Sequence, residues 1–184
     1  MTDDVDDSLL VDRAKRGDQE AFARLVDTQT PPLRKFLWRL GVSAEELDDL
    51  TQETFVTLVR ALPDFRATSA FRTFMFGIAV NVVRRARRSR RTTTSLDEVD
   101  VVAPSEGMDT TDRVELAARL RAAIARLPVA HREAFVLRHV EGLPASDVAR
   151  ALDLPEGSVR RLVFEARERL RWMLDASRIE ESPR

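Results

Sequence analysis

The stretch that decides the fold is LPASDVARALDLPEGSVRRLVFEARERL, residues 143–170. Its first half carries apolar residues at helical spacing, and Leu154-Pro155 then forces an extended residue before a second helix begins. Asp153 falls between the two helices, at a position that requires a left-handed backbone. Glycine adopts that conformation most easily, and aspartate is among the few alternatives that tolerate it. The pattern predicts a helix-turn-helix.

The second helix of this motif has two different sides. One side is an apolar stripe at 3.6-residue spacing, formed by Val159, Val163, Ala166 and Leu170. The other side carries Arg160, Arg161 and Phe164. Guanidinium groups on an exposed recognition helix bond phosphates or a guanine edge, which favours DNA binding. A helical hairpin with a solvated charged face has the same pattern and remains the alternative.

Helical periodicity continues on both sides of the motif, and no strand pattern is evident. Upstream, it predicts helices near residues 8–15, 18–40, 43–62 and 70–91, with Pro31 and Pro32 kinking or interrupting the second. Downstream, it predicts helices near 113–126, 129–140, 145–152 and 156–174. Residues 92–112 are rich in Thr, Ser, Asp and Glu and lack periodicity. We therefore predict an all-α protein of two small helical domains, 1–91 and 113–174, with a flexible acidic linker at 92–112 and a tail at 175–184.

The net charge of −1 hides a strong segregation of charge. Residues 61–91 have a net charge of +7, residues 92–112 of −6 and residues 113–174 of +4. Two basic segments separated by an acidic one indicate two contacts with a polyanion. The chain has no cysteine, which excludes disulfides and thiolate metal sites. The acidic N-terminus and the lack of a long apolar run lead us to expect a cytoplasmic protein without membrane insertion.

The helix predicted at 43–62 has an acidic face. Its core side is apolar and carries Leu47, Leu50, Phe55, Leu58 and Leu62. The opposite side carries Asp49, Gln52, Glu53 and Val56, at i, i+3, i+4 and i+7. An acidic face with one apolar residue at its centre suits a basic helical partner, although an ordinary solvated surface has the same composition.

The helix predicted at 70–91 also has two faces. The inward stripe is apolar and consists of Phe71, Phe74, Met75, Ile78, Ala79 and Val82. The side expected to face outward carries Thr73, Phe76, Val80, Arg84 and Arg87, with Asn81 on its edge. An exposed aromatic ring next to arginines suits splayed bases and their phosphates. A nonspecific basic patch is the other interpretation.

An enzyme is the least supported class. His131 and His139 are eight residues apart on one predicted helix, a rise of about 12 Å, which is too far for them to share a metal ion. No nucleophile and base are evident as a pair. We expect no catalytic residue, no metal and no cofactor.

The order of these segments resembles the extracytoplasmic function (ECF) group of the sigma-70 family of RNA polymerase sigma factors. The resemblance covers residues 8–174 and rests on four stretches: SLLVDRAKRGDQEAFARLVD, DDLTQETFVTLVRALPDF, FRATSAFRTFMFGIAVNVVRRARR and LPVAHREAFVLRHVEGLPASDVARALDLPEGSVRRLVFEAR. The first three resemble region 2 of the family, including its polymerase-binding helix and promoter-melting segment. The fourth resembles region 4.

The resemblance implies three sets of site residues. The polymerase-binding motif matches Asp48, Asp49, Leu50, Gln52, Glu53 and Phe55, with Val56 on the same helix. The loop that captures a flipped base of the minus-ten element matches Arg66, Ala67, Thr68, Ser69 and Ala70, and the helix beside it supplies Arg72, Asn81, Arg84 and Arg85. The expected outward face of that helix adds Phe76 to this set. The helix that reads the minus-thirty-five element matches Arg160, Arg161 and Phe164, with Ser158 and Arg167 as phosphate contacts. The implied partners are core RNA polymerase, promoter DNA and a cognate anti-sigma factor.

Some positions depart from the family pattern. Phe74 and Gly77 stand in the melting helix where tryptophan and a basic residue are usual, and Pro144 replaces a hydroxyl cap. Leu162 and Glu165 replace residues that are commonly basic in the recognition helix. Two further readings stay open at this stage. One is a stand-alone helix-turn-helix regulator, and the other is a decoy that keeps a protein contact without promoter function.

Overall fold

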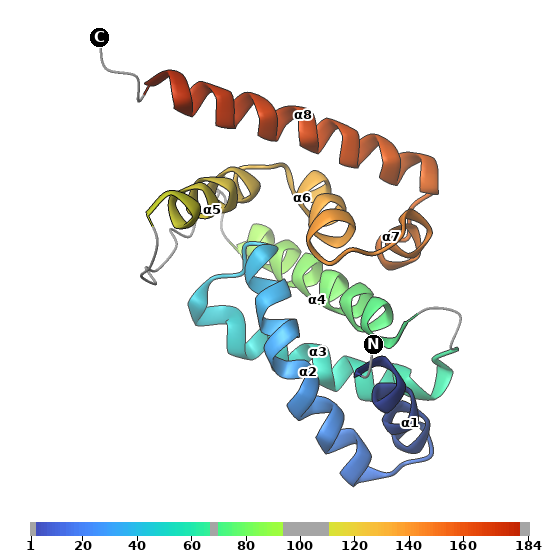
Figure 1. The fold of residues 1–184 in the computed structure, drawn as a ribbon. Helices are drawn as coiled ribbons and strands as arrows, with labels where there is room; N and C mark the ends of the chain where they lie inside the picture. Colours follow the sequence, from blue (N-terminus) through green and yellow to red (C-terminus); the bar gives the residue numbers. More distant parts are fainter. Residues whose placement is uncertain (1–2, 67–69, 94–110, 181–184) are drawn as a thin grey trace.

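The computed structural model describes residues 3–66, 70–93 and 111–180, and within these ranges the chain forms helices and no strand. The first half comprises α1 (Asp3–Lys15), α2 (Gln19–Arg39), α3 (Ala44–Ala61), the 3₁₀ turn η1 (Leu62–Asp64) and α4 (Phe71–Thr93). The second half comprises α5 (Thr111–Ala125), α6 (Val129–Phe135), the π-helical turn η2 (Val136–Val140), α7 (Ala145–Leu152) and α8 (Glu156–Glu180). Figure 1 shows their arrangement. The predicted all-α class is confirmed.

The helices of the first half pack around a shared apolar interior. Asp18 caps the N-terminus of α2, where its Oδ1 accepts the Ala21 N–H at 3.1 Å. The helix then continues through Pro31 and Pro32, so of the two expected effects, a kink or an interruption, the interruption does not occur. Leu33 and Phe36, which follow the prolines, are fully buried. Their packing against α3 and α4 offsets the hydrogen bonds that the two prolines cannot make.

The predicted helix-turn-helix is present in the second half. Asp153 adopts the left-handed conformation, with φ 54° and ψ 51°, and the Leu154 N–H donates to the Ala149 carbonyl at 3.0 Å. The turn directs α8 across α6 and α7, against which it packs. Val159, Ala166 and Leu170 are buried there, as their spacing predicts. The α8 helix ends at Glu180, beyond the predicted end at residue 174.

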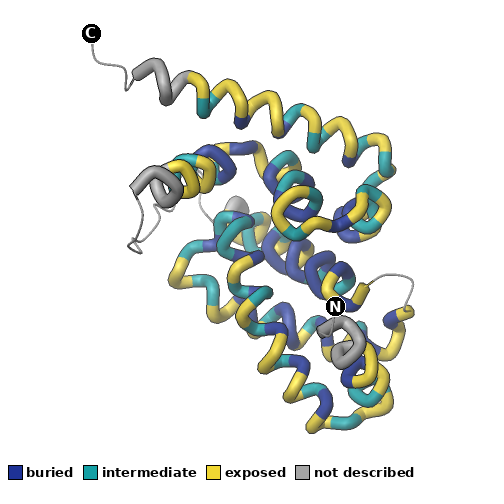
Figure 2. Tube along the Cα trace, viewed as in Figure 1, coloured by how far each residue is buried: buried dark blue, intermediate teal, exposed yellow. Residues whose placement is uncertain are grey.

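The two halves are in direct contact, which the sequence did not lead us to expect. Figure 1 shows α4 between the α1–α3 helices and the α6–α7 pair, and in Figure 2 α4 is among the most deeply buried helices. The buried apolar side chains form one cluster that runs through both halves. Most of the predicted linker lies at residues 94–110, outside the described residues. Among the residues described, each helix is too short or too polar to cross a bilayer.

The left-handed turn gives a test of this fold. Asp153→Gly should change the free energy of unfolding by less than about 1 kcal/mol, because glycine relieves backbone strain but adds entropy to the unfolded chain. Asp153→Val should lower it by about 1–2 kcal/mol, because a β-branched residue resists a positive φ. Urea unfolding followed by circular dichroism measures both variants. A valine variant as stable as the original chain would contradict the turn.

Candidate functional site

The acidic face of α3 lies on the surface, as predicted. Asp48, Asp49 and Gln52 are exposed, and Val56, one turn farther along the helix, is 42% exposed. Leu50 is buried beneath this face and supports it from the core side. The predicted helix face is therefore available to a partner.

Arginines of neighbouring helices neutralise part of this face. Arg34 of α2 pairs with Asp48, and Arg85 of α4 pairs with Glu53 at 3.1 Å. Both pairs are largely exposed, so each contributes little to stability and is easily exchanged for another partner. Asp49 lies between them on the exposed side.

A groove beside this face was missed by the sequence analysis. It lies between α2 and α3, has a volume of about 400 Å³, and has an apolar floor formed by Phe22, Val26, Phe55, Val56 and Val59. Two spacings could have indicated it. Val56 and Val59 are three residues apart, and Phe22 and Val26 are four apart, both at the margins of the core stripes. The groove continues the α3 face and adds apolar surface to it.

The outward face predicted for α4 is wrong at three positions. Phe76 is 0% exposed and stacks on Phe36 of α2, with ring centroids 4.1 Å apart and an interplanar angle of 19°. Val80 is also fully buried, and Thr73 is buried with its hydroxyl 3.3 Å from an Asp147 carboxylate oxygen of α7. The periodicity assigns one core side to each helix, but α4 is covered on more than one side. Phe76 therefore belongs to the core and is unavailable to a DNA base.

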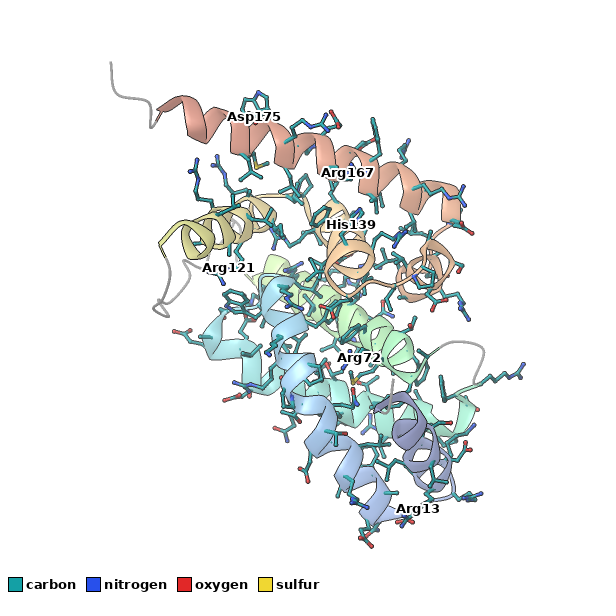
Figure 3. All side chains as sticks on the ribbon, in the orientation of Figure 1. Arg13, Arg72, Arg121, His139, Arg167 and Asp175 are labelled. Atoms are coloured by element: carbon teal, nitrogen blue, oxygen red, sulfur yellow. The ribbon has the colours of Figure 1, made fainter. Side chains whose placement is uncertain are left out.

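The basic residues predicted for the same segment are divided into two groups. Arg66, Arg72, Asn81 and Arg85 are exposed, and Figure 3 labels Arg72 near the start of α4. Arg84 instead forms an ion pair with the buried Glu133 of α6. Ala67, Thr68 and Ser69 lie outside the described residues. Part of the predicted minus-ten surface is thus exposed, and part is covered by the second half of the chain.

The predicted recognition helix is exposed. The side chains of Arg160 and Arg161 are 73% and 75% exposed, and Phe164 is 63% exposed. Arg167, labelled in Figure 3, is exposed on the same helix, and Ser158 is half-buried near its N-terminus. Arg160 has a 2.5 Å salt bridge to Glu156, one turn away on the surface. A surface ion pair of this kind yields readily to a phosphate.

Glu165, one of the departures from the family pattern, has an internal role in this chain. Its Oε2 lies 2.8 Å from His131 Nε2 of α6 and 3.4 Å from Arg169. The hydrogen bond from His131 is the main reason that the pKa of Glu165 is lowered. The residue therefore ties α8 to α6, which accounts for an acid in a basic helix. The described residues contain no cluster of potential metal ligands around either histidine.

A second unpredicted feature lies farther along α8. Trp172 is among the most exposed large apolar residues described, and with Phe164 and Met173 it lines a shallow groove of about 530 Å³. Phe164 and Trp172 are eight residues apart and lie outside the core stripe of α8. This spacing of apolar residues could have indicated the groove.

The burial of Phe76 leads to a stability prediction. Phe76→Ala should lower the free energy of unfolding by about 3–5 kcal/mol, because it leaves a cavity against Phe36. The matched control is Phe164→Ala, which removes an exposed ring and should cost less than about 0.5 kcal/mol. Chemical denaturation measures both. If Phe76→Ala were as stable as the original chain, the placement of this ring in the core would be wrong.

Comparisons with known proteins give matches along most of the chain. Residues 19–93 match the family model of Sigma-70 region 2, and residues 117–170 match that of Sigma-70, region 4. The chain is 34% identical to the RNA polymerase sigma-H factor of Pseudomonas aeruginosa, over 88% of this chain and 90% of that protein. It is 32% identical to the ECF RNA polymerase sigma-E factor of Escherichia coli K12, over 91% of this chain and 94% of that protein.

Two solved structures are also similar to this chain along most of its length. The structure of CnrH in complex with the cytosolic domain of CnrY is similar with a TM-score of 0.69 and 30% identity, covering 93% of this chain and 98% of CnrH. The sigma factor RpoE of Bartonella quintana, solved with the anti-sigma factor NepR, is similar with a TM-score of 0.66 and 22% identity. The match covers 84% of this chain and 96% of RpoE, and it supports the fold. The chain belongs to the sigma-70 family of RNA polymerase sigma factors, in its extracytoplasmic function group.

Proposed function

We propose that this sigma factor binds core RNA polymerase through the acidic face of α3 and holds promoter DNA with α4 and α8. The observation that carries the proposal is the simultaneous exposure of Asp49 on α3 and of Arg160 and Arg161 on α8. One chain thus offers an anionic protein-binding surface and a cationic DNA-binding surface on separate elements. A factor that guides a polymerase to a start site needs both.

The α3 surface suits a helical partner with basic and apolar side chains. Asp49 and Gln52 provide charge and hydrogen-bonding capacity, and the exposed Val56 leads into the apolar groove between α2 and α3. An apolar groove with a charged rim supplies buried contact area at its centre and orientation at its edge. The exposed pairs of Asp48 and Glu53 are weak enough to be replaced by pairs with the polymerase.

The α8 surface suits the major groove of the minus-thirty-five element. The N-terminal half of a recognition helix enters the groove, and a guanidinium fork there bonds the O6 and N7 atoms of guanine. Arg160 and Arg161 would supply such forks, with Phe164 against a thymine methyl group. Ser158 and Arg167, at the two ends of this surface, would contact phosphates and set the register.

Region 2 would hold the opened minus-ten element through Arg66, Arg72, Asn81 and Arg85, with residues 67–69 as part of the site of a flipped base. Binding the splayed strand offsets an unpairing cost of a few kcal/mol, so opening needs no nucleotide hydrolysis or covalent chemistry. The chain would act by differential binding, as a factor and not as an enzyme. This work would take place in the cytoplasm.

A cognate anti-sigma factor is also part of the proposal. The similar protein CnrH was solved with a bound protein, the cytosolic domain of CnrY. The α3 face and its groove offer this chain a comparable protein-binding surface. A stand-alone helix-turn-helix regulator is not favoured, because that function would not explain why residues 19–93 match region 2 of the sigma factors.

Polymerase binding is tested by charge reversal on α3. Asp49→Lys combined with Glu53→Lys should abolish co-purification with core polymerase, because the anionic face becomes cationic. Asp49→Lys alone should weaken it at least tenfold, and this variant leaves the Glu53–Arg85 pair intact. Asp12→Lys, on the exposed side of α1, is the matched control and should bind as the original chain does. Normal co-purification of the double variant would rule out this face.

Promoter reading is tested on α8. Arg160→Ala and Arg161→Ala should each lower promoter-directed transcription by about 5- to 150-fold, the equivalent of about 1–3 kcal/mol for a lost bidentate base contact. Both variants should keep normal affinity for core polymerase, measured by fluorescence titration. Arg24→Ala, on the exposed surface of α2, is the control. Equal loss of polymerase binding and transcription would count against the assigned role.

A further inference from the structure

Glu165 lies at the centre of a small polar cluster between α6 and the recognition helix. Its Oε2 lies 2.8 Å from His131 Nε2 and 3.4 Å from Arg169 Nη1, and its Oε1 lies 3.8 Å from Arg161 Nε. An ionised carboxylate only accepts hydrogen bonds, so the Nε2 atom of His131 must carry a proton and donate it. The acid is therefore anchored to α6 at one oxygen and directed toward Arg161 at the other.

The anchor matters because the contact with Arg161 is weak on its own. An arginine one turn before a glutamate is the less favourable order for a pair on a helix, and exposed pairs of this kind contribute little to stability. The side chain of His131 is only 13% exposed, on a helix that packs against α8 (Figure 1). Among the described residues its buried Nδ1 has no hydrogen-bond partner, so Nε2 makes its polar contact, the one with Glu165. The packing of α6 thus determines where the carboxylate lies.

The two arginines of the recognition surface differ in which nitrogen atom is engaged. Arg161 faces Glu165 through its Nε atom. Arg160 instead contacts Glu156 through its Nη2 atom, at 2.5 Å. An arginine that recognises guanine presents two nitrogen atoms to O6 and N7 of the base. Arg161 can present both terminal nitrogens while its Nε stays against the acid, whereas Arg160 must first give up its contact.

We propose that Glu165, held by His131, is a positioning residue that directs the guanidinium of Arg161 toward a guanine of the upstream promoter element. The inference rests on the proposed role of α8 in reading that element, and it names the base that Arg161 selects. Ordering the arginine before binding lowers the entropy that a flexible side chain loses at an interface. His131 would add to the preference for guanine without touching DNA.

The negative charge of Glu165 would affect DNA binding in two opposite ways. It repels phosphates, which weakens binding to every sequence alike. It also orients Arg161, which favours only the sequences with guanine at the matching position. Removal of the charge should therefore lower the preference for guanine without lowering transcription from the other sequences. A side chain that merely supported the fold would lower both.

The test is run-off transcription by the full chain with core polymerase, on a promoter library randomised in the upstream element. The position that Arg161 reads is the one whose guanine preference disappears in Arg161→Ala. Glu165→Gln should lower the preference at that position by about fivefold or more, because a bidentate base contact depends on its geometry. His131→Leu should lower it in the same way. His131→Gln keeps an amide donor and should retain more of the preference.

A matched control and a second measurement separate positioning from charge and from folding. Glu168→Gln removes the same charge from an exposed position of α8, where Glu168 pairs with Arg171 at 3.3 Å, and should leave the guanine preference unchanged. Nuclear magnetic relaxation of the Arg161 Nε–H group reports the order of the guanidinium, which should fall in Glu165→Gln and His131→Leu. Circular dichroism melts confirm that each variant is folded.

The outcomes distinguish this proposal from the proposed function. An unchanged guanine preference in both Glu165→Gln and His131→Leu would overturn the positioning role and leave the sigma function standing. The role would also be overturned if Glu168→Gln lowered the preference equally, if the order of the Arg161 guanidinium did not change, or if Arg161→Ala removed no guanine preference. A chain that gave no promoter-directed transcription at all would remove the proposed function, and the reading role with it.

Discussion

The carbonyl oxygen of Leu40, at the end of α2, is the point on which the arrangement of the molecule depends. It accepts one guanidinium from α4, Arg87, and one from α6, Arg132. The first contact fixes α4 against the region 2 bundle, and the second fixes region 4 against the same bundle. With α6 placed in this way, Glu133 meets Arg84 and α7 meets Gly77. The exposed face of α8 is then left on the outside of the molecule.

This arrangement separates the proposed tasks of the sigma factor by accessibility. The α3 face and the recognition residues of α8 are exposed in the joined structure, so both surfaces are accessible to a partner. The Arg84 side chain of α4 is instead paired with Glu133 of α6 and is only 27% exposed. Exposed ion pairs on α3 and α8 can be exchanged at little cost, whereas in the Arg84–Glu133 pair the carboxylate is buried.

Local patterns predicted much of this structure, because helix periodicity and turn chemistry depend on neighbouring residues. The helix-turn-helix, the left-handed Asp153 and the core stripe of α3 follow from spacing alone. The face of α4 could not be predicted in this way. Thr73 and Arg84 are covered by Asp147 and Glu133, which are 74 and 49 residues away along the chain, and Phe76 by Phe36 of another helix. A helix face that carries arginines and an aromatic ring has the same sequence pattern whether it contacts DNA or packs against other helices of the protein. The two grooves also depend on how helices meet, so only their exposed apolar residues were visible in the sequence.

The central claim is that this chain gives an RNA polymerase its choice of start site. Run-off transcription with purified core polymerase, free of other sigma factors, on a library of bacterial genomic fragments tests it most directly. We expect discrete transcripts that appear only when the chain is added and that share a pair of upstream sequence elements. Transcripts of unchanged number and start position with and without the chain would contradict it.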